Sequence, residues 1–339
     1  MARVWGESVT DVALDVRETS HMSAGMIAYV RKLRAWLPRV APDLSIAYVG
    51  GGDNFDLAEQ IGLPLACRRS GAKLAHFTTP FVPRFVPLPY VVTVHDLIDL
   101  EFPQYGKRRV GPYFRGVVGP VERGARAVIT DDPATIPLLE RYLRVDTSRV
   151  RVVPLGDDDS ADDVAPIAHP RAYVLFAGNH RPHKNLATLA TAWAALPADL
   201  VVDLVLTGDA DVRFDAARER GDIVFLGHRS DAELRRWYAG AAAYVHPALR
   251  EGFGLPMLEA MRAGAPVIAA RSAVPAVLAP HAALFDAADA ATLRVLLERV
   301  LRDPAAARRS AVAARAATSD LTWERTAART AEVYRACLA

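Results

Sequence analysis

The chain has 339 residues, 51% of them hydrophobic, and a formal net charge of +2. That length predicts two domains of about 150 residues each, and the small net charge argues against nucleic acid as a partner. The two cysteines, Cys67 and Cys337, are too few for a disulfide framework or a set of metal ligands. We therefore expect a protein of a reducing compartment, the cytoplasm.

No apolar run of the sequence reaches the roughly 18 residues that a membrane span needs, and the N-terminal residues lack the apolar segment of a signal peptide. We expect any membrane contact to be peripheral, at the inner face of the membrane. One candidate for such contact is the basic cluster of Arg31, Lys32, Arg34 and Arg39 around Trp36. A solvated helix face is the favoured explanation of this cluster.

Apolar runs of strand length alternate with helical patterns along the chain. The runs cover residues 12–16, 44–49, 90–94, 127–130 and 151–153, then residues 173–177, 201–207, 223–226, 243–246 and 266–269. Met26, Val30, Leu33 and Leu37 fall on one helical face, and residues 133–143 show the same period. This alternation predicts two parallel sheets, each with helices on both faces.

A candidate linker separates the two sets of elements. Residues 156–163 read Gly-Asp-Asp-Asp-Ser-Ala-Asp-Asp, a small and acidic stretch. We expect an N-terminal domain over residues 1–156, a C-terminal domain over residues 157–320 and a last helix over residues 321–339. Both domains are predicted to be α/β and doubly wound, and such sheets bind ligands at the carboxyl ends of their strands. The candidate residues below follow strands, which favours one shared cleft.

In the first half of the chain, His95 and Asp96 follow the strand predicted over residues 90–94. We expect His95 to face the cleft, with a structural role as the alternative. Asp96 is expected to shape the loop or to cap the next turn. Residues 77–89 contain four prolines and are expected to form a loop, either beside the cleft or as packing.

In the second half, Arg181, His183 and Lys184 stand where a strand ends and a helix is expected to begin. Cations there are unfavourable by roughly 0.3–1 kcal/mol each, because this end of the helix dipole is positive. An anionic ligand would reverse that cost, and arginine and lysine both bind phosphate. We therefore predict a phosphate site here, with a solvated basic turn as the alternative.

Further along, Ser230 and Glu233 have the spacing of a capping box, which predicts a helix start. Arg229 lies beside this cap, and the cap alone is a sufficient explanation of the segment. A ligand role for Arg229 therefore stays open.

Residues 251–261 read Glu-Gly-Phe-Gly-Leu-Pro-Met-Leu-Glu-Ala-Met and follow the strand predicted over residues 243–246. Pro256 predicts a helix start, where the missing N–H of proline costs nothing. The turn before it brings backbone N–H groups and a helix N-terminus together, which suits a phosphate. Glu251 lies before this helix and Glu259 about one turn inside it. Carboxylates beside such a pocket need hydroxyls or a cation as partners, and sugar and ribose hydroxyls meet that need.

This segment closely resembles the Glu-x7-Glu motif of the family-4 retaining glycosyltransferases, which include mannosyltransferases. The likeness covers nearly the whole chain, and the last helix resembles the family's closing helix, which returns to the N-terminal domain. The resemblance implies the GT-B fold, two Rossmann-like domains facing one cleft. It also implies transfer of a hexose, with mannose as a guess, from a nucleotide diphosphate sugar to a glycan or lipid-linked acceptor, with retention of configuration.

The resemblance further implies roles for individual residues. Glu251 would hydrogen-bond the donor sugar, Glu259 the ribose, and His95 the transferred sugar or an acceptor hydroxyl. The acceptor side would include Asp96 and Gly25, which falls in the segment that resembles the family's glycine-rich loop. The implied donor-binding residues are Gly178, Arg181, Lys184, Arg229, Gly252, Phe253, Gly254, Leu255 and Glu259.

No cofactor is implied, and no metal is expected, because Lys184, Arg181 and the N–H groups near residues 252–255 would stabilise the leaving diphosphate. The resemblance implies no protein nucleophile, because retention in the family is explained by attack on the same face of the sugar. Asp209 and Asp211 have the spacing of a metal motif, but their expected place in a loop argues against that role.

The sequence departs from the family pattern at three positions. Ile27 stands where a second glycine is common, Ala248 where a serine is frequent, and Ala276 where a glutamate is frequent. These departures keep open a non-catalytic nucleotide-sugar or glycan-binding protein, and a nucleotide-sugar epimerase of the same fold is the other alternative. The sequence does not identify the nucleobase, the sugar, the acceptor or the oligomeric state.

Overall fold

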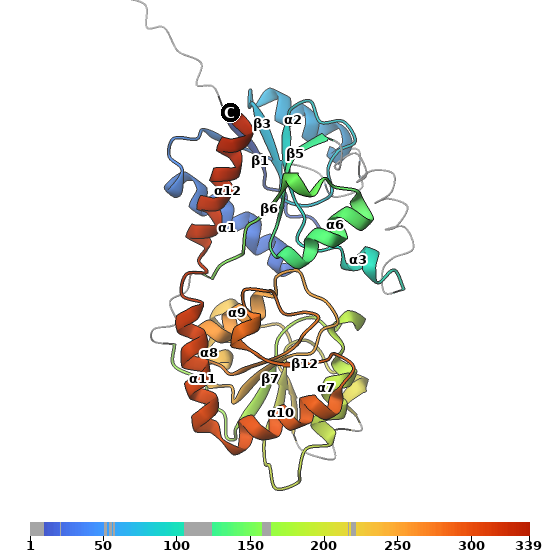
Figure 1. The fold of residues 1–339 in the computed structure, drawn as a ribbon, viewed down its shortest axis with the longest axis vertical. Helices are drawn as coiled ribbons and strands as arrows, with labels where there is room; N and C mark the ends of the chain where they lie inside the picture. The colour runs from blue at the N-terminus through green and yellow to red at the C-terminus, as the bar shows by residue number, and fades with distance from the viewer. Residues whose placement is uncertain are drawn as a thin grey trace, which may run out of the picture. The chain divides into compact units, whose positions relative to one another are not determined.

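The structure is a computed structural model that describes residues 10–20, 22–50, 53, 56, 58–104, 124–157, 164–215, 217 and 222–339. The chain forms two compact units (Figure 1). Unit 1 contains Met1–Gly156 and Thr322–Ala339, and unit 2 contains Asp157–Leu321. Most of the predicted linker, residues 158–163, lies outside the described residues, as do residues 1–9, for which we predict no signal peptide.

Unit 1 is built on a six-stranded sheet in the order β2-β1-β3-β4-β5-β6. All of its neighbouring strands are parallel. The strands are β1 (Val12–Asp15), β2 (Ile46–Val49), β3 (Leu74–Phe77), β4 (Tyr90–Thr93), β5 (Ala125–Thr130) and β6 (Val150–Val152). Strand β3 is missing from the sequence prediction. Its four residues include His76, which is fully buried and whose two ring nitrogens are hydrogen-bonded to Tyr334 and Thr93 at 2.6 and 2.8 Å.

Unit 2 has a second six-stranded sheet, in the order β12-β11-β10-β7-β8-β9. Its neighbouring strands are also parallel. The strands are β7 (Tyr173–Phe176), β8 (Asp203–Leu206), β9 (Ile223–Phe225), β10 (Ala243–His246), β11 (Val267–Ala270) and β12 (Ala283–Phe285). Strand β12 is missing from the sequence prediction. The α/β prediction of two doubly wound parallel sheets is confirmed.

The strand order of unit 2 reverses between β7 and β10. From β7 the chain builds outward through β8 and β9, and then returns to place β10 on the other side of β7. Doubly wound sheets bind ligands at such a switch point, because the loops after the two strands diverge and leave a crevice at the carboxyl ends. The loops after β7 and β10 are therefore neighbours, although their residues are far apart in the sequence.

Helices pack against both sheets. In unit 1 they are α1 (Ala24–Val40), α2 (Leu63–Arg69), α3 (Ile98–Glu101), α6 (Ile136–Leu143) and α12 (Trp323–Leu338). In unit 2 they are α7 (Leu186–Ala194), α8 (Asp231–Gly240), α9 (Leu255–Arg262), α10 (Ala290–Arg302) and α11 (Pro304–Ala317). The predicted apolar face of α1 is largely confirmed, since Val30, Leu33 and Leu37 are buried.

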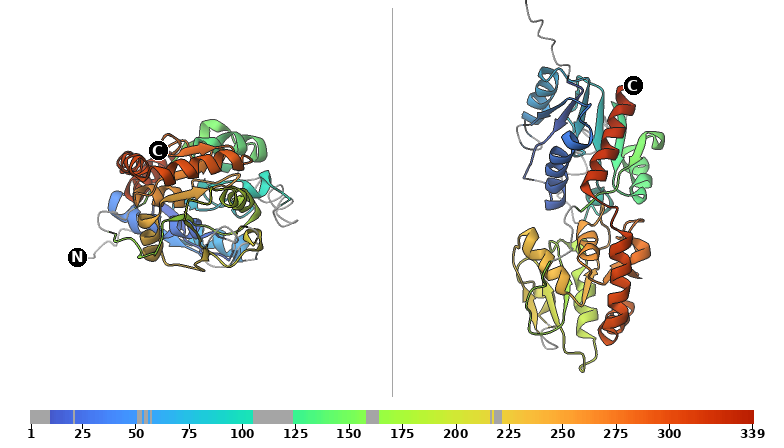
Figure 2. Two further views of the ribbon diagram at one scale, coloured as in Figure 1. Left: turned by 90° about the horizontal axis from the view of Figure 1, so that it is seen from below. Right: turned by 90° about the vertical axis from the view of Figure 1, so that its left-hand side faces the viewer.

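The last helix, α12, packs against α1 within unit 1 (Figures 1 and 2). Its buried face includes Trp323 and Tyr334. The Tyr334 hydroxyl contacts His76 in β3, and the Trp323 ring lies 6.4 Å from the ring of Tyr29 in α1. These contacts attach the C-terminal end of the chain to the helix and the sheet of unit 1.

The chain passes from unit 1 to unit 2 after Gly156 and returns to unit 1 after Leu321, and these two segments lie side by side. A side chain at Gly156 would place its first carbon 2.0 Å from the carbonyl carbon of Thr322. Only glycine permits that approach. The next residue, Asp157, donates its backbone N–H to the carbonyl of Leu321 at 3.0 Å. The glycine at the start of the predicted linker is thus required by close packing of the two crossing segments.

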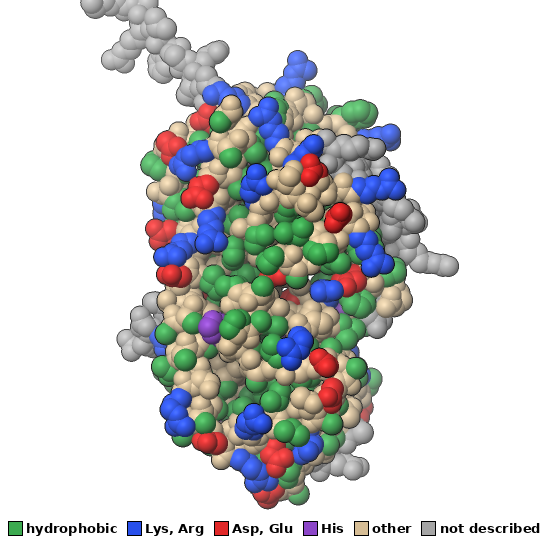
Figure 3. Space-filling model, viewed as in Figure 1, with side chains coloured by type: hydrophobic (Ala, Val, Ile, Leu, Met, Phe, Trp, Pro, Cys, Tyr) green, Lys and Arg blue, Asp and Glu red, His purple; other side chains and the backbone are tan. Residues whose placement is uncertain are grey.

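Acidic and basic side chains are interspersed on the face shown in Figure 3. Among the described residues on that face, no continuous basic surface suited to nucleic acid is visible. None of the described helices is long and apolar enough to cross a membrane.

Candidate active site

The predicted turn before α9 is confirmed. Helix α9 begins at Leu255, directly after Gly254, and Pro256 lies in its first turn. Gly254 has φ +74° and ψ +52°, the left-handed conformation that side chains make unfavourable. The glycine therefore lets the chain turn sharply from the loop after β10 into the helix, with Glu251 just outside it.

Glu251 is held by two side chains, one from the turn after β7 and one from the end of its own strand, β10. The amino group of Lys184 and the Nε2 atom of His246 both contact its Oε2, His246 at 3.1 Å. Burial raises the pKa of the Glu251 carboxyl, but the charge of Lys184 and the hydrogen bond from His246 outweigh it, so that the pKa is well below its usual range. Glu251 is therefore ionised at neutral pH and can only accept hydrogen bonds.

The loop after β7 carries Lys184 to this position. Pro182–Lys184 form a short 3-10 turn, and Asn185 follows it in the left-handed conformation. The amide of Asn185 donates to the carbonyls of Pro247 and Ala287 at 3.0 and 2.7 Å. The backbone N–H of Leu249 donates to the carbonyl of His183 at 2.8 Å. Backbone and side-chain bonds thus join this turn to the loop after β10.

The predicted basic segment lies in a different local structure from the one expected. Arg181, His183 and Lys184 do not lie at the first turn of α7, which begins at Leu186 after the separate 3-10 turn. The left-handed Asn185 breaks the helix between the two segments. Lys184 is buried at Glu251, whereas Arg181 is exposed to solvent. Donor binding by Arg181 and by Gly178, which lies in the loop after β7, stays a prediction.

Glu259 lies in α9, one turn beyond the glycine. It accepts a hydrogen bond from the Tyr238 hydroxyl at 3.2 Å. Burial, together with the negative charge of Asp157, raises its pKa to about 7, and the charge of Arg235 opposes this rise. Arg235 is itself paired with Asp157 at 2.6 Å. Glu259 therefore changes its protonation state near neutral pH.

The capping box before α8 is confirmed. The Ser230 side chain accepts from the backbone of Glu233, and the Glu233 carboxylate accepts from the backbone N–H of Ser230 at 3.0 Å. The Arg229 guanidinium donates to the carbonyl of His228 at 2.9 Å. Its ligand role stays a prediction, as do those of Gly252, Phe253, Gly254 and Leu255.

In unit 1, His95 follows β4 and is buried. Its Nδ1 lies 2.7 Å from Oδ2 of Asp131, which follows β5. The rings of Tyr29 and His95 pack edge to face, with their centroids 4.7 Å apart. Burial lowers the pKa of His95, but the charge and hydrogen bond of Asp131 outweigh it and raise the pKa. Nε2 of His95 is buried and has no hydrogen-bond partner among the described residues. Asp96 shapes the loop before α3, where its Oδ1 accepts from the backbone N–H of Ile98 at 3.0 Å, and its place on the acceptor side stays a prediction.

The prediction that Gly25 lies in a loop is wrong. The Ser23 hydroxyl accepts from the N–H of Met26 at 3.4 Å, and α1 therefore begins at Ala24 with Gly25 in its first turn. Ile27 also lies in this helix and is half-buried rather than in the core. The acceptor role of Gly25 stays a prediction, now for a helix N-terminus.

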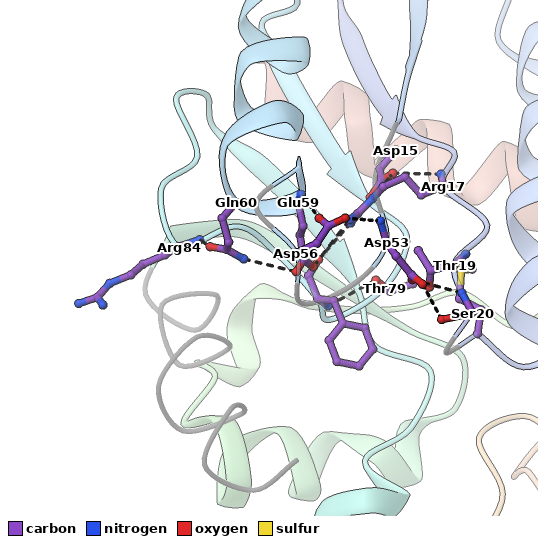
Figure 4. A network of polar contacts seen from close by, with 12 residues as sticks. Asp15, Arg17, Thr19, Ser20, Asp53, Asp56, Glu59, Gln60, Thr79 and Arg84 are labelled. Carbon is purple, nitrogen blue, oxygen red and sulfur yellow. Dashed lines mark hydrogen bonds and ion pairs between the residues drawn. The ribbon is translucent and has the colours of Figure 1, made fainter. Parts of the chain in front are cut away.

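A buried polar network lies at the end of β1 in unit 1 (Figure 4). The guanidinium of Arg17 donates to both carboxylate oxygens of Asp15, at 2.8–3.0 Å, and to the carbonyl of Phe81 at 3.3 Å. Glu59, which is fully buried, lies 3.7 Å from the same guanidinium. Burial raises the pKa of Asp15 despite the charge of Arg17. This network joins β1, the turn before α2 and the loop after β3.

In the pair of aspartates with metal-motif spacing, Asp211 already contacts neighbouring side chains. Asp211 pairs with the side chain of Arg213 and lies 3.1 Å from Nδ1 of His180, whereas Asp209 is exposed. Among the described residues, no group of three or more histidine, cysteine or carboxylate side chains could hold a metal ion.

The basic cluster on α1 is partly engaged in local contacts. Arg31 pairs with Glu18 at 2.6 Å, Arg34 lies over the Tyr48 ring, and Arg39 lies over the Trp36 ring. These contacts agree with a solvated helix face, and peripheral membrane contact stays a prediction.

Several site residues were not predicted. His246 and Tyr238 contact the two predicted glutamates, and Asp131 contacts His95. His246 and Asp131 both lie at or directly after the end of a strand, which is the signal that could have found them.

Solved structures share the fold of this chain. Sucrose-phosphate synthase from Thermosynechococcus elongatus matches it with a TM-score of 0.74 at 21% identity, over 96% of this chain and 98% of that one. HepE of Anabaena, crystallised with UDP-glucose, matches with a TM-score of 0.69 at 18% identity, over 96% of this chain and 99% of that one. The fold is that of the GT-B glycosyltransferases.

Part of unit 2 matches a known domain family. Residues 171–303, which include Lys184, Glu251 and Glu259, match the family described as "Glycosyl transferases group 1". The chain therefore contains a group 1 glycosyltransferase domain, and the resemblance seen in the sequence is confirmed.

Curated relatives include mannosyltransferases. O-antigen chain mannosyltransferase B of Escherichia coli is 24% identical over 265 residues, which are 72% of this chain and 70% of that protein. Serotype-specific mannosyltransferase WbdA of Escherichia coli is 30% identical over 200 residues, 56% of this chain and 24% of that protein. The match to WbdA thus spans about a quarter of that protein's length.

Proposed function

We propose that this glycosyltransferase moves a hexose from a nucleotide diphosphate sugar to a glycan or lipid-linked acceptor, with retention of configuration. The observation that carries the proposal is the partly buried contact of Lys184 with Glu251 at the switch point of unit 2. The amino group and the carboxylate lie side by side before α9, and we propose that the first binds the diphosphate and the second a sugar hydroxyl. A helix N-terminus also favours phosphate.

The protonation of the site supports these roles. Because the Glu251 pKa is lowered, the carboxylate is an acceptor for a sugar hydroxyl and not a proton donor. Glu259 would accept from the ribose hydroxyls. In unit 1, Nε2 of His95 is buried without a protein partner among the described residues, which suits a contact with a sugar hydroxyl of a substrate.

In the proposed reaction, an acceptor hydroxyl oxygen bonds to the anomeric carbon on the face from which the diphosphate oxygen departs. The acceptor proton passes to that departing oxygen. Lys184, Arg181 and the N–H groups near residues 252–255 would stabilise the negative charge of the leaving nucleoside diphosphate. We propose that no metal, cofactor or protein nucleophile is needed.

The relatives favour mannose as the sugar, since both curated relatives named above are mannosyltransferases. The complex of HepE with UDP-glucose supports a nucleotide-sugar donor in general. We propose a cytoplasmic site of action in polysaccharide biosynthesis, with peripheral contact to the inner face of the membrane where the acceptor is lipid-linked.

Calorimetric binding of UDP, GDP and ADP, followed by incubation with the matching sugar donors, tests the proposal. We expect one diphosphate to bind in the micromolar range, and its donor to release a sugar whose anomeric configuration by NMR is unchanged. If none of the three binds, the proposed donor site fails. Binding without turnover would favour a non-catalytic binding protein, and an epimerised product would favour the epimerase.

A further inference from the structure

The buried end of β10 carries two polar side chains to which the proposed mechanism assigns no role. Tyr244 and His246 are two residues apart on the strand and are both fully buried. The Tyr244 hydroxyl lies 2.9 Å from Nδ1 of His246, and Nε2 of His246 lies 3.1 Å from Oε2 of Glu251. The three side chains form a continuous chain of hydrogen bonds that ends at the predicted sugar ligand.

The protons in this chain can be assigned from its chemistry. Glu251 is ionised and can only accept, so Nε2 of His246 must carry the hydrogen that it receives. Burial lowers the pKa of His246, although Glu251 opposes this change, so the ring is neutral and Nδ1 presents a lone pair. The Tyr244 hydroxyl, whose pKa burial raises well above its usual value, keeps its one hydrogen and has two acceptors within reach, Nδ1 of His246 at 2.9 Å and the carbonyl of Ala177 at 3.4 Å. Because Nδ1 carries no hydrogen, the shorter contact is a donation from the hydroxyl to Nδ1.

One carboxylate oxygen of Glu251 remains for a ligand. Both Lys184 and His246 contact Oε2, and Oε1 accepts no hydrogen bond from the described residues. The Glu251 side chain is 17% exposed, whereas that of His246 is fully buried. With Oε2 fixed by two donors, the carboxylate cannot rotate without breaking a buried hydrogen bond.

We propose that His246 is a positioning residue that, oriented by Tyr244, fixes Glu251 so that Oε1 accepts a hydroxyl of the donor sugar. This inference rests on the proposed function and names the residue that orients its central carboxylate. His246 does not touch the substrate. Its effect is on the turnover of the sugar rather than on the binding of the nucleotide.

The first test measures the release of GDP from GDP-mannose, or of the diphosphate from whichever of UDP-glucose and ADP-glucose the protein hydrolyses. His246→Phe is expected to lower kcat about ten- to a hundredfold, the range found when a supporting hydrogen bond is removed. The Kd of the nucleoside diphosphate alone should stay within about twofold, because no sugar is present to use Glu251. If His246 only supported the fold, the substitution would change both kcat and the Kd of the nucleoside diphosphate.

Three further variants sharpen the comparison. The amide of His246→Gln can donate in place of Nε2 and is expected to restore kcat to within about fivefold of the wild type. Tyr244→Phe should lower kcat by about two- to tenfold, since one neutral hydrogen bond is lost. Tyr173→Phe is the matched control: it removes a buried hydroxyl of the same sheet, bonded to the Trp237 carbonyl at 2.7 Å, and should leave kcat unchanged.

The tautomer gives a readout that does not depend on activity. In the wild-type protein, the ¹⁵N shifts of the His246 ring are expected to show a protonated Nε2 and an unprotonated Nδ1. The opposite tautomer, or a kcat for His246→Phe within about twofold of wild type, would overturn the inference while leaving the proposed function in place. If the wild-type protein hydrolyses none of the three donors, the proposed function fails and the positioning role fails with it.

Discussion

The amino group of Lys184 and the carboxylate of Glu251, 67 residues apart in the sequence, form a partly buried ion pair in unit 2. Lys184 lies in the loop after β7 and Glu251 in the loop after β10. These two strands are neighbours because the strand order reverses between them. Breaking a buried pair leaves an uncompensated charge, which is costly. A phosphate that binds Lys184 therefore meets a cation already fixed in place beside the carboxylate.

Lys184→Met removes the charge and keeps much of the side-chain volume. We expect the Kd of the nucleoside diphosphate to rise about ten- to a hundredfold, because a hydrogen bond to a charged group is worth about 1.5–3 kcal/mol. The Kd of the nucleoside should change by less than about twofold. Calorimetry checks both values, and equal losses for the two ligands would contradict a phosphate role. Arg181→Met, which removes an exposed cation, serves as the comparison and should have the smaller effect.

Glu251→Gln keeps the shape of the side chain and removes its charge. Transfer is expected to fall about a hundredfold or more, since a charged contact to the reacting sugar is lost. Donor turnover, measured by release of nucleoside diphosphate, checks this outcome, and circular dichroism should report an unchanged fold. Full activity in the folded variant would remove Glu251 from the site.

The raised pKa of Glu259 makes unit 2 less stable as the pH rises. The folded-state pKa is about 7 against an ordinary value of 4.5, so the folded state holds a proton that the unfolded state has released. The free energy of unfolding should therefore decrease between about pH 5 and pH 8, by on the order of 3 kcal/mol at most.

Denaturant unfolding of the wild type and of Glu259→Gln at several pH values measures this decrease. The neutral glutamine cannot release a proton, so the variant should lose most of the pH dependence in that range. An identical decrease in both proteins would mean that another group is responsible.

Asp131 is expected to control the charge of His95. Asp131→Asn removes the carboxylate that raises the pKa of His95, and the pKa should fall below its wild-type value. An NMR pH titration of the His95 ring measures the change. Asp132→Asn is the matched control, because the neighbouring Asp132 accepts from the backbone of Ala134 at 2.8 Å and asparagine caps equally well. A His95 pKa that is the same in all three proteins would show that Asp131 does not act on the ring.

EDTA is expected to leave donor turnover unchanged, because the cationic side chains and backbone N–H groups are proposed to stabilise the leaving group. The check is the rate of nucleoside diphosphate release before and after chelation. Loss of activity that Mg²⁺ or Mn²⁺ restores would overturn the metal-free mechanism.

Local sequence signals predicted much of the candidate site. Gly254 and Pro256 indicated the turn into α9, and Ser230 with Glu233 indicated the start of α8, because caps and turns depend on a few adjacent residues. The predictions failed at strands β3 and β12, which they did not include, and at Gly25, which the cap at Ser23 places in a helix rather than in a loop.

The sequence by itself determined the α/β class and the motif that identifies the family, since both depend on periodicity and on residues close together in the chain. Only the tertiary structure decided which distant side chains meet. Lys184 reaches Glu251, and Asp131 reaches His95, because neighbouring parallel strands bring their carboxyl ends, and the loops after them, to one edge of a sheet. Burial there sets the charges of these groups, and burial is a property of the packed fold rather than of any short segment.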